Sequence, residues 1–189
     1  IEFAKGSSFQ LSRDYMLDVL RMVGNVTLNR SKRAASEVVR FKEDPKLGGF
    51  IYPLMQIEDV AALKADVAFG GIDQRGIYML GREMLPTLGH KKPVCVFTPL
   101  LPGLTGGKMS ASVEKSKLDL LDSEKDVEKK VIGAQCPAGK VEGNGILAFL
   151  KYVIMVLKQD AGKEFIVPRP AKYGGDASYG SYEEIEKAF

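Results

Sequence analysis

Residues 65–75 read Ala-Asp-Val-Ala-Phe-Gly-Gly-Ile-Asp-Gln-Arg, and this stretch decides the fold. A short apolar run from Ala65 to Phe69 ends in Gly70 and Gly71, and a helical pattern then runs from about Asp73 to Leu85. A strand, a glycine turn and a helix in this order are typical of one unit of a parallel sheet. We therefore predict an α/β fold.

The next apolar run along the chain supports the same architecture. Residues 93–97 read as a second buried strand, and the loop 99–107 after it contains two prolines and three glycines. Ligands of open parallel sheets bind beyond the carboxyl ends of the strands. We therefore expect a binding site at this edge of the sheet.

Helical periodicity of apolar residues predicts six further helices, and Ser12 is a plausible N-cap of the first. The predicted ranges are 11–22, 29–41, 52–64, 122–132, 146–158 and 181–189. A glycine-rich link occupies 136–145, before the fifth of these helices. The helical C-terminal part can begin a second domain.

Composition excludes little beyond membrane spans and zinc motifs. The 27 basic and 24 acidic residues give a net charge of +3, which is too small to indicate nucleic-acid binding by itself. The two cysteines and the single histidine, His90, form no ligand spacing, so we expect no protein-held metal and assign His90 to the surface. No apolar run approaches the roughly 20 residues that span a bilayer. We expect a reduced, cytoplasmic compartment.

Three polar side chains share one face of the predicted helix 52–64. Tyr52, Gln56 and Asp59 stand at positions i, i+4 and i+7, which brings them to the same side of a helix. An exposed helix face and one wall of a binding pocket are both compatible with this pattern. Near the strand end, Asp73 can accept hydrogen bonds from ribose hydroxyls or can cap a helix.

Residues 106–112, Gly-Gly-Lys-Met-Ser-Ala-Ser, place one ammonium and two hydroxyls on a glycine-containing loop. A lysine on a loop that closes over ATP can neutralise the charge that develops on leaving pyrophosphate. A plain surface turn is the alternative interpretation of such a segment.

The segment Lys108 to Ser112 resembles the KMSKS loop of class I aminoacyl-tRNA synthetases. Residues 52–59 and 65–75 are similar, in order and spacing, to the amino-acid pocket of tyrosyl-tRNA synthetases of the archaeal and eukaryotic branch. The resemblance extends over essentially the whole chain. It departs from the family at Ala111, where the loop mostly has serine, and at Gly76, where relatives usually carry a base.

The resemblance implies a role for each candidate site residue. Tyr52, Gln56 and Gln74 would hold the substrate tyrosine, and Asp59 would receive its phenolic hydroxyl. ATP would bind at Gly70, Gly71, Asp73, Lys108 and Met109, with Lys108, Ser110 and Ser112 catalytic. Arg33 and Arg75 would contact the acceptor end of the tRNA.

The resemblance also implies how the chain is organised. Residues 1–50 would contain a helical dimerisation insertion, residues 51–135 the second half of a Rossmann-like catalytic domain, and residues 136–189 a linker and the start of a helical anticodon-binding domain. The partners would be L-tyrosine, ATP with its Mg²⁺, tRNA(Tyr) and either a second copy of the chain or the other half of a tandem pseudo-dimer.

The histidine motif that the family uses to stabilise the ATP phosphates does not occur in the sequence. We therefore expect these 189 residues alone to be incomplete as an enzyme. The alternatives are a non-catalytic synthetase-like module and, because of Ala111, a tryptophanyl-tRNA synthetase. The tyrosine-type position of Asp59 argues against the last.

Overall fold

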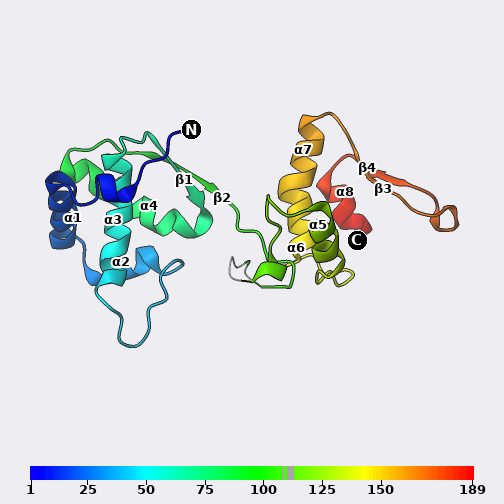
Figure 1. Ribbon diagram of the computed structural model, residues 1–189, viewed down its shortest axis with the longest axis horizontal. Helices are drawn as coiled ribbons and strands as arrows, with labels where there is room; N and C mark the ends of the chain where they lie inside the picture. The colour runs from blue at the N-terminus through cyan, green and yellow to red at the C-terminus, as the bar shows by residue number, and fades with distance from the viewer. Residues whose placement is uncertain (108, 110–112) are drawn as a thin grey trace. The chain divides into compact units, whose positions relative to one another are not determined.

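The computed structural model describes residues 1–107, 109 and 113–189 (Figure 1). Two compact units follow one another along the chain, Ile1–Leu100 and Leu101–Phe189. The first unit contains the predicted parallel strands and the helices that cover them, and the second is mainly helical.

Four helices and two strands make up the first unit, together with three short 3-10 segments. The helices are α1 (Arg13–Asn25), α2 (Leu28–Ala35), α3 (Gly48–Ala62) and α4 (Arg75–Met84), and the strands are β1 (Val67–Gly71) and β2 (Val94–Thr98). The 3-10 segments are η1 (Gly6–Ser8), η2 (Ile72–Gln74) and η3 (Leu85–Leu88).

The predicted cap of the first helix is confirmed, since Ser12 Oγ accepts a hydrogen bond from the backbone N–H of Tyr15. The predicted helix 29–41 is wrong in its second half because α2 ends at Ala35. Beyond it, Val38, Val39 and Phe41 pack against the hydrophobic core. Burial of these three side chains outweighs the helical pattern in the sequence. The predicted helix 52–64 begins earlier than expected, at Gly48.

The two strands pair in parallel, with Val67 opposite Val94 and Gly71 opposite Thr98. The parallel arrangement is confirmed. The prediction that the second strand is buried is wrong, because Val94 is 57% and Val96 is 43% exposed. Side chains alternate between the two faces of a sheet, and only one face meets the core.

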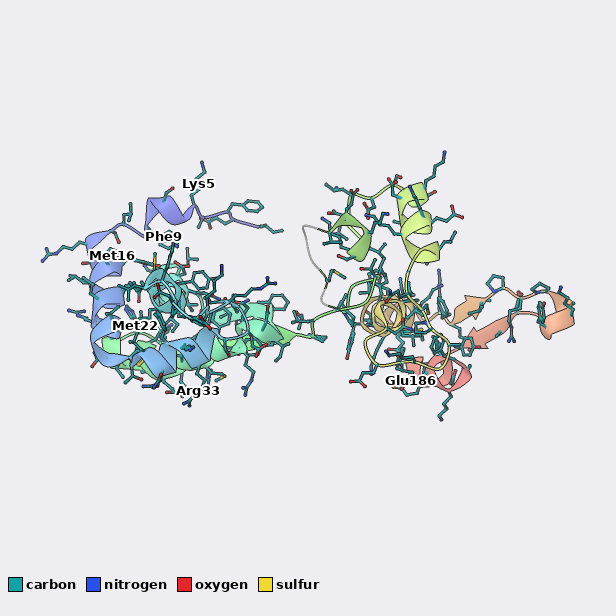
Figure 2. The ribbon with its side chains drawn as sticks, turned by 90° about the horizontal axis from the view of Figure 1, so that it is seen from below. Lys5, Phe9, Met16, Met22, Arg33 and Glu186 are labelled. Atoms are coloured by element: carbon teal, nitrogen blue, oxygen red, sulfur yellow. The ribbon has the colours of Figure 1, made fainter. Side chains whose placement is uncertain are left out.

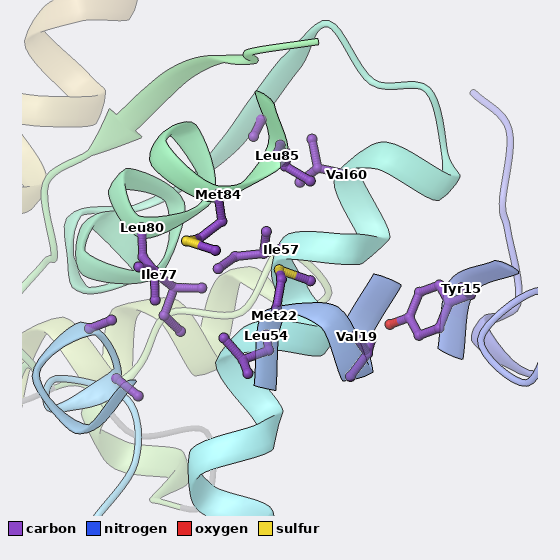
Figure 3. Packing of buried hydrophobic residues seen from close by; sticks show 13 residues of the cluster. Tyr15, Val19, Met22, Leu54, Ile57, Val60, Ile77, Leu80, Met84 and Leu85 are labelled. Atoms are coloured by element: carbon purple, nitrogen blue, oxygen red, sulfur yellow. The ribbon is translucent and has the colours of Figure 1, made fainter. Parts of the chain in front are cut away.

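The core of the first unit lies between α1, α3 and α4 (Figure 3). Met22, Ile57 and Ile77, one from each helix, are fully shielded from solvent. At about 25 cal/mol for each Å² of apolar surface removed from water, such side chains stabilise the unit by roughly 2 kcal/mol each. This packing holds α3, which carries most of the predicted tyrosine pocket, against the strand ends.

Helices and one hairpin form the second unit. The helices are α5 (Glu124–Ile132), α6 (Gly145–Phe149), α7 (Met155–Asp160) and α8 (Tyr182–Ala188), with a π-helical turn at Leu150–Ile154 and 3-10 turns at Glu114–Ser116 and Ala171–Tyr173. Strands β3 (Phe165–Val167) and β4 (Ala177–Tyr179) pair antiparallel. The predicted helices 122–132, 146–158 and 181–189 are confirmed within two residues at every end, and the middle one contains the π-helical turn.

Candidate functional site

Helix α3 carries three of the predicted pocket residues on one face. Tyr52 is 45% exposed, whereas Gln56 and Asp59 are partly buried. A polar face that is partly buried, on a helix whose other side packs in the core, differs from an ordinary solvated helix surface. The geometry is compatible with one wall of a binding site.

Gln56 links α3 to the segment that follows the end of β1. Its Nε2 donates a hydrogen bond of 3.0 Å to Oε1 of Gln74, which lies at the end of η2. The other amide atom, Gln56 Oε1, is buried and has no hydrogen-bond partner among the described residues. A buried acceptor without a partner costs on the order of 1–3 kcal/mol, which a donor group of a ligand, such as an ammonium, would recover.

Asp59 is held by two side chains that the sequence analysis did not single out. Its Oδ1 accepts hydrogen bonds of 2.9 Å from the hydroxyl of Tyr15 and of 2.9 Å from Nε2 of Gln10. Within the described part of the chain, no hydrogen bond reaches the second oxygen, Oδ2. One oxygen thus orients the carboxylate and the other can accept a hydrogen bond from a ligand.

Tyr15 remains protonated in this arrangement. Burial, with the hydrogen bond to Asp59 and the charge of that carboxylate, raises the pKa of Tyr15 well above its ordinary value. The hydroxyl also lies 2.9 Å from the carbonyl oxygen of Met55, so its single proton serves two acceptors. The apolar stripe of the predicted helix 11–22 could place Tyr15 in a core but could not indicate Asp59 as its partner.

Two glycines leave room for polar side chains at the end of β1. A Cβ built on Gly71 would lie 2.6 Å from Oδ1 of Asp73, and one on Gly70 would lie 3.3 Å from Cγ of Gln74. Asp73 lies inside η2, and Gln74 occupies the N-cap position of α4. The glycines allow Asp73 and Gln74 to fold closely over the strand end.

The two arginines predicted to contact tRNA are both exposed. Arg33 precedes Ala34 on α2, and Arg75 precedes Gly76 on α4. A Cβ on Gly76 would lie only 2.4 Å from the carbonyl oxygen of Ala34, so the two helices approach closely at this point. Arg33 lies at the outer edge of its unit in Figure 2.

Most of the predicted lysine loop, Lys108, Ser110, Ala111 and Ser112, lies outside the described residues. Before it, Gly106 and Gly107 have φ angles of 84° and 71°, in the left-handed region that favours glycine. The backbone N–H of Gly103 donates to the carbonyl of Gly107 at 2.8 Å, which closes a tight turn ahead of the lysine. Met109 is partly buried.

His90 lies at the surface only in part, with 34% of its side chain exposed. Its Nε2 lies 2.7 Å from Oδ2 of Asp18, a carboxylate that is itself buried. The pair joins α1 to the segment between η3 and β2.

In the described part of the chain, no helix is long and apolar enough to cross a membrane.

The family described as "tRNA synthetases class I (W and Y)" matches residues 1–189. The chain belongs to this family. Over its whole length the chain is 53% identical to a tyrosine–tRNA ligase from Haloarcula marismortui. It covers 55% of the length of that relative. It is 47% identical to a cytoplasmic tyrosine–tRNA ligase from Danio rerio, of which it covers 35%.

Solved structures place the chain with the same synthetases. A tyrosyl-tRNA synthetase from Archaeoglobus fulgidus, determined in complex with L-tyrosine, superposes with a TM-score of 0.84 at 50% identity, and the alignment covers all of this chain and 57% of that one. The resemblance to tyrosyl-tRNA synthetases of the archaeal and eukaryotic type is therefore confirmed. This synthetase chain spans about half the length of the archaeal relatives that it matches.

Proposed function

We propose that the full-length protein activates L-tyrosine with ATP to form tyrosyl-adenylate and then transfers the tyrosyl group to tRNA(Tyr). Support comes from the tyrosine–tRNA ligases that match this chain over its whole length, while the chain spans about half of the archaeal ones. The site geometry supports the choice of tyrosine as the amino acid.

One observation carries this choice: the pocket residues have acceptor atoms left for a ligand. Gln56 Oε1 is buried without a partner among the described residues, and Asp59 is oriented through Oδ1 alone. In the proposed complex, Tyr52, Gln56 and Gln74 hold the ammonium and the body of tyrosine. Asp59 accepts the phenolic hydroxyl, so phenylalanine would leave this carboxylate unpaired.

The nucleotide part of the proposal rests on the strand end and the lysine loop. Gly70 and Gly71 allow close approach of the nucleotide, and Asp73 accepts hydrogen bonds from the ribose. Met109 contacts the adenylate, Lys108 neutralises charge on the phosphates, and the hydroxyls of Ser110 and Ser112 donate hydrogen bonds to them. The substrate ATP brings its own Mg²⁺.

The proposed chemistry is in-line attack of the tyrosine carboxylate on the α-phosphorus of ATP, which releases pyrophosphate. The terminal ribose hydroxyl of the tRNA then attacks the tyrosyl carbonyl and releases AMP. No covalent intermediate with the protein is needed, because positioning and charge stabilisation lower the barrier. Arg33 and Arg75 bind the acceptor end of the tRNA through guanidinium groups suited to phosphates.

The finer architecture is part of the same proposal. Residues 1–50 include the dimerisation insertion, residues 51–135 the second half of a Rossmann-like domain, and residues 136–189 the start of the anticodon-binding region. The protein acts as a cytoplasmic homodimer. The name of the Danio rerio relative supports the compartment.

Replacing Asp59 tests the proposal. In the full-length protein, we expect Asp59→Asn to lower kcat/KM for tyrosine in ATP–pyrophosphate exchange by roughly thirtyfold, which corresponds to about 2 kcal/mol for one hydrogen bond to a charged group. Exchange with phenylalanine is expected to change much less, because phenylalanine has no hydroxyl to donate.

The matched control is Asp66→Asn, since the Asp66 side chain is 81% exposed and lies outside the proposed pocket. This variant should keep the exchange rates of the parent protein. Absence of tyrosine-dependent exchange in the parent protein, or an equal loss for tyrosine and phenylalanine in Asp59→Asn, would contradict the proposed role of the pocket.

A further inference from the structure

A second cluster of polar side chains lies in the first unit, outside the proposed substrate pocket. Asp18 on α1, Glu58 on α3 and His90 after η3 each offer one ligand atom, and these atoms all lie within 4.8 Å of one another. The three residues come from three separate segments of the chain. The cluster forms only because the core packs these segments together.

Glu58 has an unusual environment for a carboxylate. Only 3% of the residue is exposed, and its Oε2 is buried without a hydrogen-bond partner in the described part of the chain. Buried carboxylates are normally paired or coordinate metal ions.

We propose that Asp18, Glu58 and His90 bind a divalent transition-metal ion such as Zn²⁺. One imidazole nitrogen and two carboxylate oxygens form a ligand set that Zn²⁺ accepts, with water in the remaining position. An imidazole in the set favours such an ion over Mg²⁺ or Ca²⁺, which prefer oxygen ligands only.

The dimensions of the cluster fit this ion. Ligand atoms about 2.1 Å from a tetrahedral ion lie roughly 3.4 Å from one another. Here Nε2 of His90 and Oδ2 of Asp18 are 2.7 Å apart, and none of the three ligand atoms is more than 4.8 Å from another. The expected spacing of roughly 3.4 Å lies between these two values.

The surroundings orient the ligands. Arg21 donates a hydrogen bond of 2.8 Å to Oδ1 of Asp18. This contact holds the carboxylate in an orientation in which its other oxygen, Oδ2, faces His90. The Arg21 side chain is 61% exposed, so water screens its charge. His90 also lines a pocket of about 320 Å³.

Such an ion would act as a structural brace between α1 and α3. Asp18 follows Tyr15 by one helical turn, and Glu58 is next to Asp59, the carboxylate to which Tyr15 donates. The ion neutralises the buried charge of Glu58 and stabilises the same helix pair. The proposal does not depend on the proposed tyrosine activation, because its ligands are separate from the substrate pocket.

Metal titration of the full-length protein tests the site. Protein freed of metal with a chelator is titrated with Zn²⁺ by calorimetry and with Co²⁺, whose visible absorption reports its ligands. We expect the parent protein to bind both ions and Glu58→Gln and His90→Gln to bind them at least about tenfold more weakly. Asp66→Asn, which removes an exposed carboxylate from the same pocket, should bind like the parent protein.

Glu58→Gln removes only the charge and keeps the side-chain volume, and circular dichroism of each variant checks the fold. His90→Gln provides a second measurement at a partly exposed position. The proposal is overturned if the parent protein binds neither ion, or if either ligand variant binds them as tightly as the parent protein does.

Discussion

At the scale of single residues, the carboxylate of Asp59 is the centre of the candidate pocket. Tyr15 and Gln10 both donate to Oδ1, and Tyr15 also reaches the carbonyl of Met55. In the proposed complex the hydroxyl of Tyr15 is a positioning group, because it orients Asp59 through Oδ1 and leaves Oδ2 for the ligand. Its buried ring packs edge-on against Phe9.

Replacement of Tyr15 by phenylalanine should separate binding from chemistry. We expect Tyr15→Phe in the full-length protein to raise KM for tyrosine about fivefold, which corresponds to roughly 1 kcal/mol for one hydrogen bond. The value of kcat should change by less than about twofold, because the hydroxyl touches no reacting atom. Steady-state pyrophosphate exchange measures both constants.

The matched control is Tyr173→Phe, since Tyr173 is 65% exposed and its ring remains in the variant. It should leave KM and kcat unchanged. An unchanged KM in Tyr15→Phe, or a loss confined to kcat, would show that Tyr15 does not position Asp59.

At the scale of elements, α2 and α4 approach each other closely at Gly76. In this chain a Cβ at Gly76 would lie 2.4 Å from the carbonyl oxygen of Ala34. Glycine therefore permits the close approach of the two helices.

A substitution at this contact should destabilise the first unit. We expect Gly76→Ala to lower the free energy of unfolding by about 1–3 kcal/mol, because the added methyl group must push α2 and α4 apart. Denaturant unfolding of the full-length protein, followed by circular dichroism, measures the change.

Gly24→Ala is the control for helix propensity. Gly24 lies in α1, and a Cβ at this position meets no atom within 4 Å. The substitution should stabilise the protein by up to about 1 kcal/mol, since alanine is the better helix former. Equal stabilisation by Gly76→Ala would mean that α2 and α4 do not need the close approach.

At the scale of the whole molecule, one exposed apolar surface bears on the proposed dimer. Leu17, Leu20 and Val23 on the outer side of α1 are 39%, 58% and 43% exposed. Apolar side chains at this spacing share a helix face, while Val19 and Met22 on the other side are buried in the core. This surface lies within the segment proposed as the dimerisation insertion and fits a self-complementary interface.

A charge on this surface should prevent association. We expect Leu20→Glu to convert the full-length protein from dimer to monomer at micromolar concentration, because burying an unpaired carboxylate in an apolar interface is unfavourable. Sedimentation velocity measures the mass, and circular dichroism checks that α1 still folds.

Lys125→Glu introduces the same charge at an exposed position of α5 and should leave the dimer intact. A monomeric parent protein would contradict the proposed dimer. A dimer that persists in Leu20→Glu would place the interface elsewhere.

The helices, the parallel strand unit and the family could all be predicted from local patterns in the sequence. Apolar periodicity and caps identified the helices, the glycine pair after residues 65–69 indicated a parallel strand unit, and the order of motifs identified the family. The tyrosine, ATP and tRNA roles of the site residues stay predictions.

Only the tertiary structure decided which distant side chains meet. Tyr15 and Asp59 are 44 positions apart, and Asp18 and His90 are 72 positions apart, so no local spacing connects either pair. The early end of α2 and the exposed face of β2 could not be predicted for the same reason. In both cases burial depends on which segments pack together. Periodicity tells which face of an element is apolar, but core packing selects the partners of its polar groups.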